Sequence, residues 1–305
     1  MHVSVPAGLA IAAAHTDSDL EAMIAVSVAP DPDRHPPRLE NLRHNLSAQG
    51  LMYLVAWHDG EPVACGFVYP DVPETYAEAH VVVVPSARCG GIGSAMLQRA
   101  GAAARGADKA QLQGEVRADD ATSRSYLERR GYSVVGGEQA VALHLETLEP
   151  PTPSPPEGIA IVSLEDRPDL VDALYIVGTE GAEDIPGFPG RPTYEQWRAF
   201  DIDRPTRPRK FFFIALAGDE PIGYTTLDDY GSDAFHGLTT VRRQWRGRGI
   251  ATALKLTQIA AAKHAGFRRL VTASEERNEP MRNLNAKLGY TSEPTLSTVV
   301  MCGPA

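Results

Sequence analysis

The chain has 305 residues, of which 43% are hydrophobic and 22% charged, and its formal net charge is -10. This length is enough for two globular domains. The acidic balance, with Lys and Arg spread along the chain, argues against nucleic acid or an anionic membrane as the main partner. Cys65, Cys89 and Cys302 have neither paired nor metal-type spacing. We therefore expect no disulfide framework, no metal site and a reducing, cytoplasmic location.

The first elements alternate between strand and helix. The apolar opening, Val3 to Ala14, predicts a strand, since it has no preceding Lys or Arg and contains a proline, unlike a signal peptide. Residues 8–23 continue this strand into a helix that begins with acidic residues. Residues 56–69, "AWHDGEPVACGFVY", alternate around a Gly and Asp turn and predict a hairpin. An apolar strand, "VVVVP" at 81–85, then enters "PSARCGGIGSAML", which ends at Leu97.

The second half repeats this pattern. Residues 158–174 repeat the strand and helix, 215–227 the hairpin, and 235–241 the apolar strand that precedes "QWRGRGIATALK". Arg246 lies 158 residues after Arg88, and the same offset separates the later "RRGY" and "KLGY" turns. A shared offset indicates an internal repeat. Before its hairpin the second copy has a longer segment, residues 181–197, which contains Phe188, Tyr194 and Trp197. This segment is expected either to form a wall of the acceptor pocket or to pack against the other domain.

The domain boundary is predicted at "EPPTPSPPE", residues 149–157, because its prolines forbid a helix and favour an extended spacer. We predict an N-terminal domain at 1–148 and a C-terminal domain at 158–305. Each reads as a mixed α/β domain, with a mostly antiparallel sheet flanked by helices. The basic run at 203–210 is predicted to be a solvated turn rather than a phosphate patch.

The Arg- and Gly-rich loop at 244–255 predicts an anion site, because the first amides of a helix lack intrahelical acceptors and lie at the positive end of its dipole. A Walker-type loop is excluded, since Ile250 follows Gly249 where that loop needs Lys. A dinucleotide fingerprint fits poorly, since Thr252 stands at its last glycine. A phosphate is the expected guest.

These residues resemble the GNAT superfamily of acetyl-CoA-dependent N-acetyltransferases, and the resemblance covers nearly the whole chain as two tandem copies. The family signature is Gln or Arg, two residues, Gly, one residue, then Gly or Ala, after a strand that ends in Val. The resemblance implies that this loop binds the pyrophosphate of coenzyme A and that the pantetheine arm runs between two splayed strands. The coenzyme residues it implies are Val241, Arg246, Gly247, Arg248, Gly249, Ile250, Ala251, Thr252 and Asn278 in the second copy, and Val83, Arg88, Gly91, Ile92, Gly93 and Ser94 in the first.

Both copies depart from the family pattern at the position of the general acid. Family members often place a Tyr four residues before the last helix's Gly, where this chain has Asn285 and Leu127. Asn285 can donate a hydrogen bond to the coenzyme or its sulfur, whereas Leu127 cannot. We therefore expect the second copy to be catalytic and the first to be partly degenerate, structural or regulatory.

Several residues are candidates for a general base. His236 begins the central strand of the second copy, Glu78 lies 158 residues earlier, and Glu275 and Glu276 end the following strand. For any one of them, however, the sequence favours a solvated strand-end charge or a hydrogen-bonded histidine over a catalytic base.

The expected reaction is direct transfer of an acetyl group from acetyl-CoA to a primary amine of a small molecule. Tandem copies at this length also resemble the mycothiol synthases, which acetylate a cysteinyl amine. A non-catalytic acyl-CoA-binding module is the third interpretation, motivated by the missing tyrosines. The sequence leaves the acceptor and the oligomeric state open.

Overall fold

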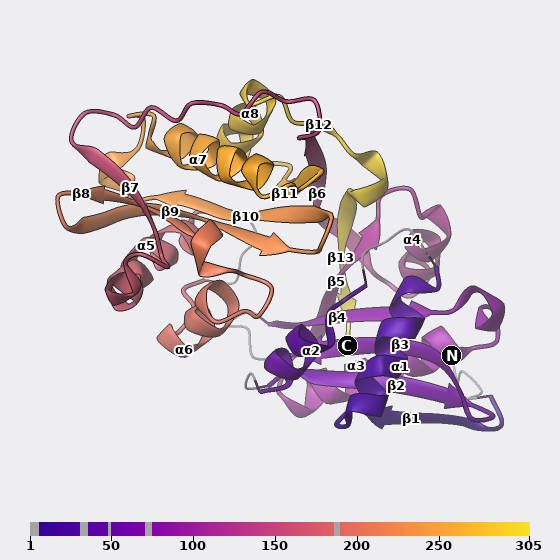
Figure 1. Ribbon diagram of the computed structural model, residues 1–305. Coiled ribbons are helices and arrows are strands. Elements are labelled where there is room, and N and C mark those ends of the chain that lie inside the picture. Colours follow the sequence, from indigo (N-terminus) through magenta and orange to yellow (C-terminus); the bar gives the residue numbers. More distant parts are fainter. Residues whose placement is uncertain (1–5, 31–35, 48–49, 71–74, 186–189) are drawn as a thin grey trace. The chain divides into compact units, whose positions relative to one another are not determined.

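The computed structural model describes residues 6–30, 36–47, 50–70, 75–185 and 190–305. Two compact units divide the chain, one made of residues 1–135 and 299–305 and the other of residues 136–298. Both are mixed α/β units, as predicted, and their elements are labelled in Figure 1.

The first unit is a mixed sheet with helices on both faces. Its strands are β1 (Leu9–Ala13), β2 (Met52–His58), β3 (Glu61–Tyr69), β4 (Tyr76–Val83), β5 (Gln111–Arg117) and β13 (Thr298–Pro304), and its helices are α1 (Asp17–Val28), α2 (Leu39–Leu46), α3 (Ile92–Gly106) and α4 (Ala121–Glu128). The strands neighbour one another in that order; β1 to β4 pair antiparallel, and β4 and β5 pair parallel. Helix α1 begins with a capping box between Thr16 and Asp19.

The second unit repeats this plan. Its strands are β6 (Ser133–His144), β7 (Ile159–Ser163), β8 (Phe213–Ala217), β9 (Glu220–Asp229), β10 (Asp233–Val241), β11 (Arg269–Glu275) and β12 (Thr291–Ser292), and its helices are α5 (Val171–Glu183), α6 (Tyr194–Trp197), α7 (Ile250–His264) and α8 (Glu279–Lys287). The sheet order is β7-β8-β9-β10-β11-β6, with β10 and β11 parallel and β12 on β6. Residues 149–157 form no helix or strand, as their prolines predict.

The last strand of each sequence copy lies in the other unit. From Gly136 onward β6 belongs to the second unit, where it pairs antiparallel with β11. Beside β5 the corresponding place is taken by β13. Leu143 joins the core of the second unit, and Met301 joins that of the first. The compact units therefore do not have the bounds 1–148 and 158–305 that the sequence repeat predicts. The reason is that each of these two strands packs in the unit formed mainly by the other copy.

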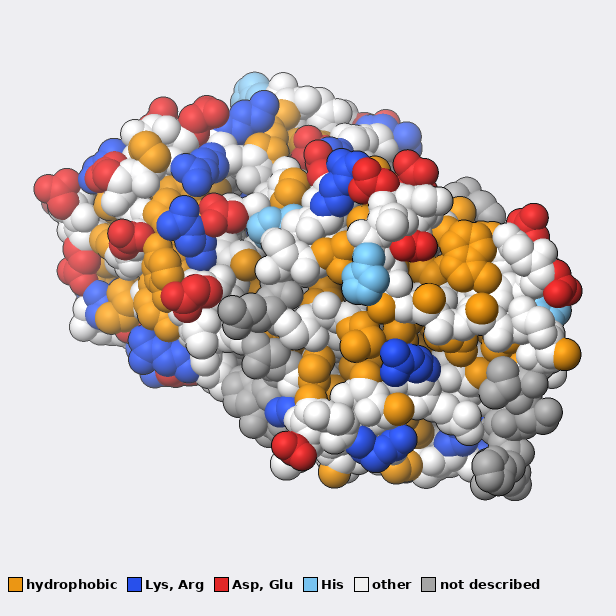
Figure 2. All heavy atoms as spheres, turned by 90° about the horizontal axis from the view of Figure 1, so that it is seen from below, with side chains coloured by type: hydrophobic (Ala, Val, Ile, Leu, Met, Phe, Trp, Pro, Cys, Tyr) orange, Lys and Arg blue, Asp and Glu red, His pale blue; other side chains and the backbone are white. Residues whose placement is uncertain are grey.

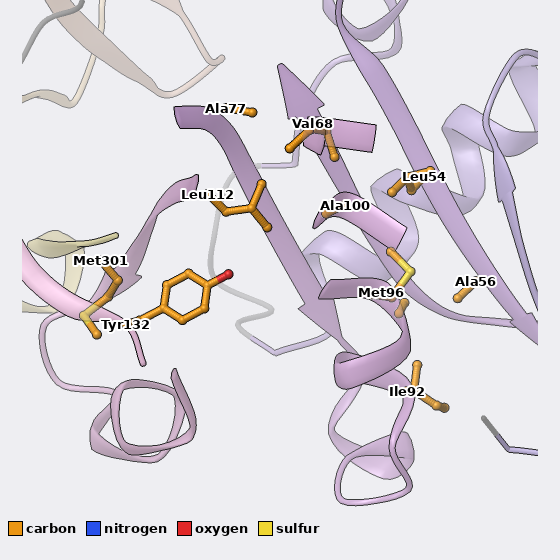
Figure 3. Packing of buried hydrophobic residues seen from close by; sticks show 12 residues of the cluster. Leu54, Ala56, Val68, Ala77, Ile92, Met96, Ala100, Leu112, Tyr132 and Met301 are labelled. Carbon is orange, nitrogen blue, oxygen red and sulfur yellow. The ribbon is translucent and has the colours of Figure 1, made fainter. Parts of the chain in front are cut away.

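The core of the first unit lies on both faces of its sheet. Leu54 and Met96 belong to a cluster between the sheet and α3, and Figure 3 shows Tyr132 beside Met301 in the same cluster. On the other face, Leu20 of α1 packs against Tyr53 of β2. Alternate residues of β2 thus point to opposite faces, which is the strand period of two.

The second unit has the same layers. In Figure 1, α7 lies on one face of the sheet formed by β8, β9 and β10, and α5 lies on the other. Leu254 of α7 packs against Ile222 of β9. Leu174 of α5 packs with Trp197 and Tyr224. In the segment predicted to line a pocket or to pack, Trp197 is 2% exposed and so is core, whereas Phe188 lies outside the described residues.

The basic run at 203–210 is a solvated turn only in part, since Asp203, Arg209 and Lys210 are exposed but Arg207 is buried. Arg207 is 7% exposed, and its guanidinium donates to Asp228 Oδ2 at 2.7 Å and to the carbonyl oxygens of Phe200 and Asp201 at 3.0 Å. Asp228, on β9, is 1% exposed. Arg207 is therefore an interior residue, because β9 supplies a buried carboxylate that the local sequence does not indicate.

On the face shown in Figure 2, acidic and basic side chains of the described residues are intermixed and form no large area of one sign. This distribution agrees with the spread of Lys and Arg in the sequence. Among the described residues, no helix is long and apolar enough to cross a membrane.

Candidate functional site

The loop after β10 has a backbone form that requires its glycines. Gly247 and Gly249 have φ of 73° and 81°, in the left-handed region. A Cβ on either would meet no atom within 4 Å, so the backbone angle and not crowding requires glycine here. Arg246 Nε donates to the Val241 carbonyl at 2.8 Å and ties the loop to the end of the strand. Helix α7 then begins at Ile250.

Consecutive backbone N–H groups are available at this turn. Those of residues 247–252 donate to no acceptor in the part of the chain that the structure describes. They combine the unpaired amides of a helix N-terminus with the positive end of its dipole. This arrangement suits a phosphate or pyrophosphate group.

Most arginines of the loop are paired with the end of α5. Arg243 donates to Glu183 at 3.0 Å and to Asp184 at 2.8 Å, and Arg246 also donates to Asp184. Burial alone would raise the pKa of Asp184, but hydrogen bonds from these two arginines hold it below its usual value. Arg248 has no carboxylate partner among the described residues, and its guanidinium lies over the Trp245 ring. The loop therefore offers an anion its amides and one unneutralised cation.

The first copy has a loop of the same form. Cys89 and Gly91 have φ of 65° and 87°, and α3 begins at the next residue. Arg88 Nε donates to the Val83 carbonyl at 3.2 Å, as Arg246 does in the second copy. The N–H groups of residues 89–94 have no acceptor among the described residues. The backbone of both loops can thus receive an anion.

The two central strands separate in both copies. Strand β10 pairs with β11 only over Asp233–Phe235, although both strands continue beyond. In the first copy, β4 pairs with β5 only over Tyr76–Glu78. Beyond these pairs the two strands of each copy no longer pair with each other, so their backbone groups on this side are not used in a ladder between them.

A β-bulge distinguishes the second copy. The register between β9 and β10 shifts between His236 and Thr239, whereas β3 and β4 pair without a shift from Ala64–Val83 to Tyr69–Glu78. The extra residue changes the correspondence between copies: Glu78 matches Phe235, and not His236 as the constant offset implied. A bulge next to splayed strands re-aims backbone groups, as bulges often do beside active sites.

The three predicted catalytic residues lie on two faces of the sheet. His236 is fully buried, and its Nδ1 lies 2.9 Å from the Tyr290 hydroxyl. Asn285 is 2% exposed and lies 3.5 Å from Ser274 on β11. Glu275 is the next residue of this strand and so points to the opposite face. There its carboxylate accepts from the Arg277 side chain at 2.7 Å.

An open cavity of about 540 Å³ lies beside α8 in the second unit. Its lining residues come from α8 and from the strand segments beside it, namely Gln139, Val141, Ser274, Glu279, Arg282, Asn283, Asn285, Ala286, Tyr290 and Ser292. The Asn285 Oδ1 is buried and has no hydrogen-bond partner. Asn278, which is predicted to contact the coenzyme, caps α8 by accepting from the Met281 N–H at 3.3 Å. The Asn285 Oδ1 acceptor is buried beside the cavity, so a ligand in the cavity would reach it only after the Asn285 side chain moves.

Comparison with known proteins decides the family. The model of the acetyltransferase (GNAT) family matches residues 19–132 and 180–290. The chain belongs to the GNAT acetyltransferase family. The two matched segments make it a tandem GNAT protein. No match was found among curated proteins.

Solved structures share the fold over the whole chain. A GCN5-related N-acetyltransferase from Sphaerobacter thermophilus is 21% identical, with a TM-score of 0.73, covering 99% of this chain and 97% of its own. A tandem GNAT protein from the clavulanic acid biosynthesis pathway is also 21% identical, with a TM-score of 0.73, covering 97% and 98%. A glucosamine N-acetyltransferase region of a fungal β-N-acetylglucosaminidase is 15% identical, with a TM-score of 0.70, covering 98% and 38%. At these identities the likeness shows the GNAT fold.

Two polar residues beside the predicted sites, Tyr126 and Lys255, were not indicated by the sequence motifs. In the first copy the Tyr126 hydroxyl, one residue before Leu127, lies 2.7 Å from Oγ of the predicted Ser94. In the second copy Lys255 of α7 is 1% exposed and contacts His236. The sequence does contain a hint of this, because Lys255 lies between two leucines in the predicted helix. A lysine in such a place can lie on the buried face of the helix.

Proposed function

We propose that this tandem GNAT protein transfers an acetyl group from acetyl-CoA to a primary amine of a small molecule, with the second copy as the catalytic one. The observation that carries this proposal is the run of unpaired N–H groups at 247–252, directly beside the splayed strands β10 and β11. Unpaired amides beside two strands that separate are what a pyrophosphate followed by a narrow pantetheine arm requires.

Three features favour the second copy. Its central strand is bulged, whereas β4 of the first copy is regular. It has a cavity beside α8 with the unpaired Asn285 Oδ1, where the first copy has Leu127. Its loop also carries Arg248 at the position of Gly90 in the first copy. The first copy retains the anion loop, so it is proposed to bind coenzyme or to support the fold.

The proposed reaction forms a C–N bond between the amine and the acetyl carbon and breaks the C–S bond of the thioester. The amine must lose a proton and the departing sulfur must gain one. The Asn285 amide can donate to the sulfur or the carbonyl through Nδ2 and accept from an N–H group through Oδ1. Glu275 acts as a base in this proposal only after it leaves Arg277, because both its carboxylate oxygens accept from that residue.

Calorimetric titration with acetyl-CoA, followed by a thiol-release assay with a panel of amines, tests the function. We expect binding and amine-dependent release of coenzyme A. Failure to bind acetyl-CoA would refute the proposal. Binding without thiol release for any amine would identify a non-catalytic acyl-CoA-binding module instead, and release only with a cysteinyl amine would favour a mycothiol-synthase-like reaction.

Asn285→Leu gives the second copy the residue that the first copy has at the same position, Leu127. We expect kcat to fall by about 10- to 100-fold, because one hydrogen bond to a developing charge is lost. The midpoint of thermal unfolding should be unchanged or higher, since the variant removes a buried acceptor that has no partner. Leu127→Met is the matched control and should leave kcat unchanged. Equal turnover in the Asn285 variant would remove this residue from the reaction.

A further inference from the structure

A group of buried polar side chains surrounds His236 in the second unit. We call it the His236 cluster; its members are Thr225, His236, Thr239, Lys255 and Tyr290. The ring Nε2 lies 3.0 Å from Thr225 Oγ1 and 3.2 Å from Lys255 Nζ, and Nδ1 lies 2.9 Å from the Tyr290 hydroxyl. Residues of β9, β10, α7 and the turn after α8 thus meet at one imidazole.

The cluster contains a lysine without a counter-ion. Lys255 is 1% exposed, and no carboxylate of the described residues pairs with it. Burial lowers its pKa from 10.5 to about 7. Burial and the charge of Lys255 hold the pKa of His236 well below its usual value. A buried lysine of this kind costs stability, so its presence calls for a reason beyond folding.

The other surroundings of Lys255 carry no compensating charge. From β10 it meets His236, and its ammonium lies 5.4 Å from the centre of the Tyr290 ring. From β9 the neighbouring group is the Thr225 hydroxyl, which also bonds to Gln258 of α7. Gln258 in turn donates to the Phe211 carbonyl, in the turn before β8. Strands β7 and β8 present apolar side chains to α7. The titratable neighbours of Lys255 are therefore His236 and Tyr290.

The first copy shows that the fold does not require this cluster. The strand registers and helix starts match its five members, in order, to Gly66, Ala79, Val81, Leu97 and Tyr132. Only the tyrosine is retained, and its hydroxyl donates to the Pro304 carbonyl. The cluster and the bulge occur together in one copy and are both missing from the other.

The cluster is attached to the bulge itself. His236 and Thr239 are the residues between which the register of β10 shifts. Thr225, across on β9, bonds to both of them, at 3.0 Å and 2.7 Å. Tyr290 also lines the cavity beside α8. The cluster therefore links the bulge, the splayed strands and the wall of the cavity.

We propose that Lys255, His236 and Tyr290 are positioning residues for acetyl transfer: they fix the β10 bulge, and Lys255 sets where the protons of His236 and Tyr290 lie. This inference rests on the proposed function of the second copy. A protonated Lys255 can only donate, so Nε2 of His236 accepts and Nδ1 carries the ring proton toward Tyr290. A neutral Lys255 can also accept, which permits the opposite tautomer and reverses the bond to Tyr290.

Lys255→Met tests the proposal, because it keeps the side-chain length and removes the amine. We expect kcat to fall by about tenfold, as for other residues that act through a neighbour, with KM for acetyl-CoA little changed. In the unaltered protein kcat should decrease as the pH falls through about 7, where Lys255 becomes charged. In the Lys255→Met variant kcat should not show this decrease near pH 7. The separate pH dependence that comes from protonation of the amine substrate should remain.

Stability gives a readout that is independent of activity. Between pH 7 and about 10 the unfolded chain binds one more proton than the native one, because the lysine pKa is lowered on folding. The unaltered protein therefore loses stability from this group as the pH falls through that range. We expect Lys255→Met to unfold at a higher temperature than the unaltered protein, by a larger margin at pH 7 than at pH 10.

Tyr290→Phe and Tyr132→Phe form a matched pair. The first removes the hydroxyl that His236 contacts and should lower kcat by several-fold; the second removes the equivalent hydroxyl of the first copy and should leave kcat unchanged. Equal kcat in both variants, or parallel pH profiles for Lys255→Met and the unaltered protein, would overturn the positioning role. If the unaltered protein turned over no amine, the proposed function would fail instead, and the pH-dependent stability would still test the state of Lys255.

Discussion

Gly249→Asp is expected to abolish acetyl-CoA binding by the second copy. The substitution places a carboxylate beside the unpaired amides of residues 247–252, where the pyrophosphate is proposed to lie. Like charges in close contact cost several kcal/mol, so we expect affinity to fall by at least about 100-fold. The backbone adds to this, because φ at Gly249 is 81°. Calorimetry with acetyl-CoA measures the loss.

Two controls separate the causes. Gly249→Ala retains the backbone strain without the charge, and since a Cβ there meets no atom within 4 Å it should bind acetyl-CoA within about tenfold of the unaltered protein. Gly91→Asp makes the same change in the first copy and should leave amine-dependent turnover intact. Loss of turnover in the Gly91 variant alone would show that the first copy is catalytic.

Asp228→Asn is expected to destabilise the second unit by about 3 to 5 kcal/mol, because it leaves the guanidinium of Arg207 buried without its main carboxylate. Arg207 is 7% exposed and donates to Asp228 at 2.7 Å. Chemical denaturation followed by circular dichroism measures the free energy of unfolding.

The double variant Asp228→Leu with Arg207→Met tests the cause. Apolar residues in place of the whole pair should recover most of the lost stability, as in other buried ion pairs. Asp119→Asn, in the exposed pair with Arg117, should produce no measurable change. A loss in the double variant as large as that in Asp228→Asn would mean that packing, and not an unpaired charge, explains the effect.

Much of the fold could be predicted because its signals are local. The Gly and Asp turns predicted the hairpins, which form as β2–β3 and β8–β9. The signature at Arg246 and Gly249 predicted a loop that opens a helix, and α7 begins at Ile250. Each signal lies within a few residues of the element it specifies, so the sequence alone contains it.

The candidate site was predicted less completely, because its geometry depends on contacts between distant residues. A one-residue bulge in β10 changed the match between the copies, so that Glu78 corresponds to Phe235. His236 is a member of a buried cluster whose partners Lys255 and Tyr290 come from other elements. Strand register is set by pairing across the sheet, and no offset along the chain reveals it.

By itself the sequence determined that the chain is a repeat of two acetyltransferase-like copies, each with a glycine-containing loop that opens a helix, because turn, cap and loop residues act on their immediate neighbours. Only the tertiary structure decided that β6 and β13 lie in units other than those of their own copies, and that Arg207 and Lys255 are interior. Burial depends on which surfaces the folded chain brings together, so the charge and exposure of these side chains follow from packing and not from their place in the sequence.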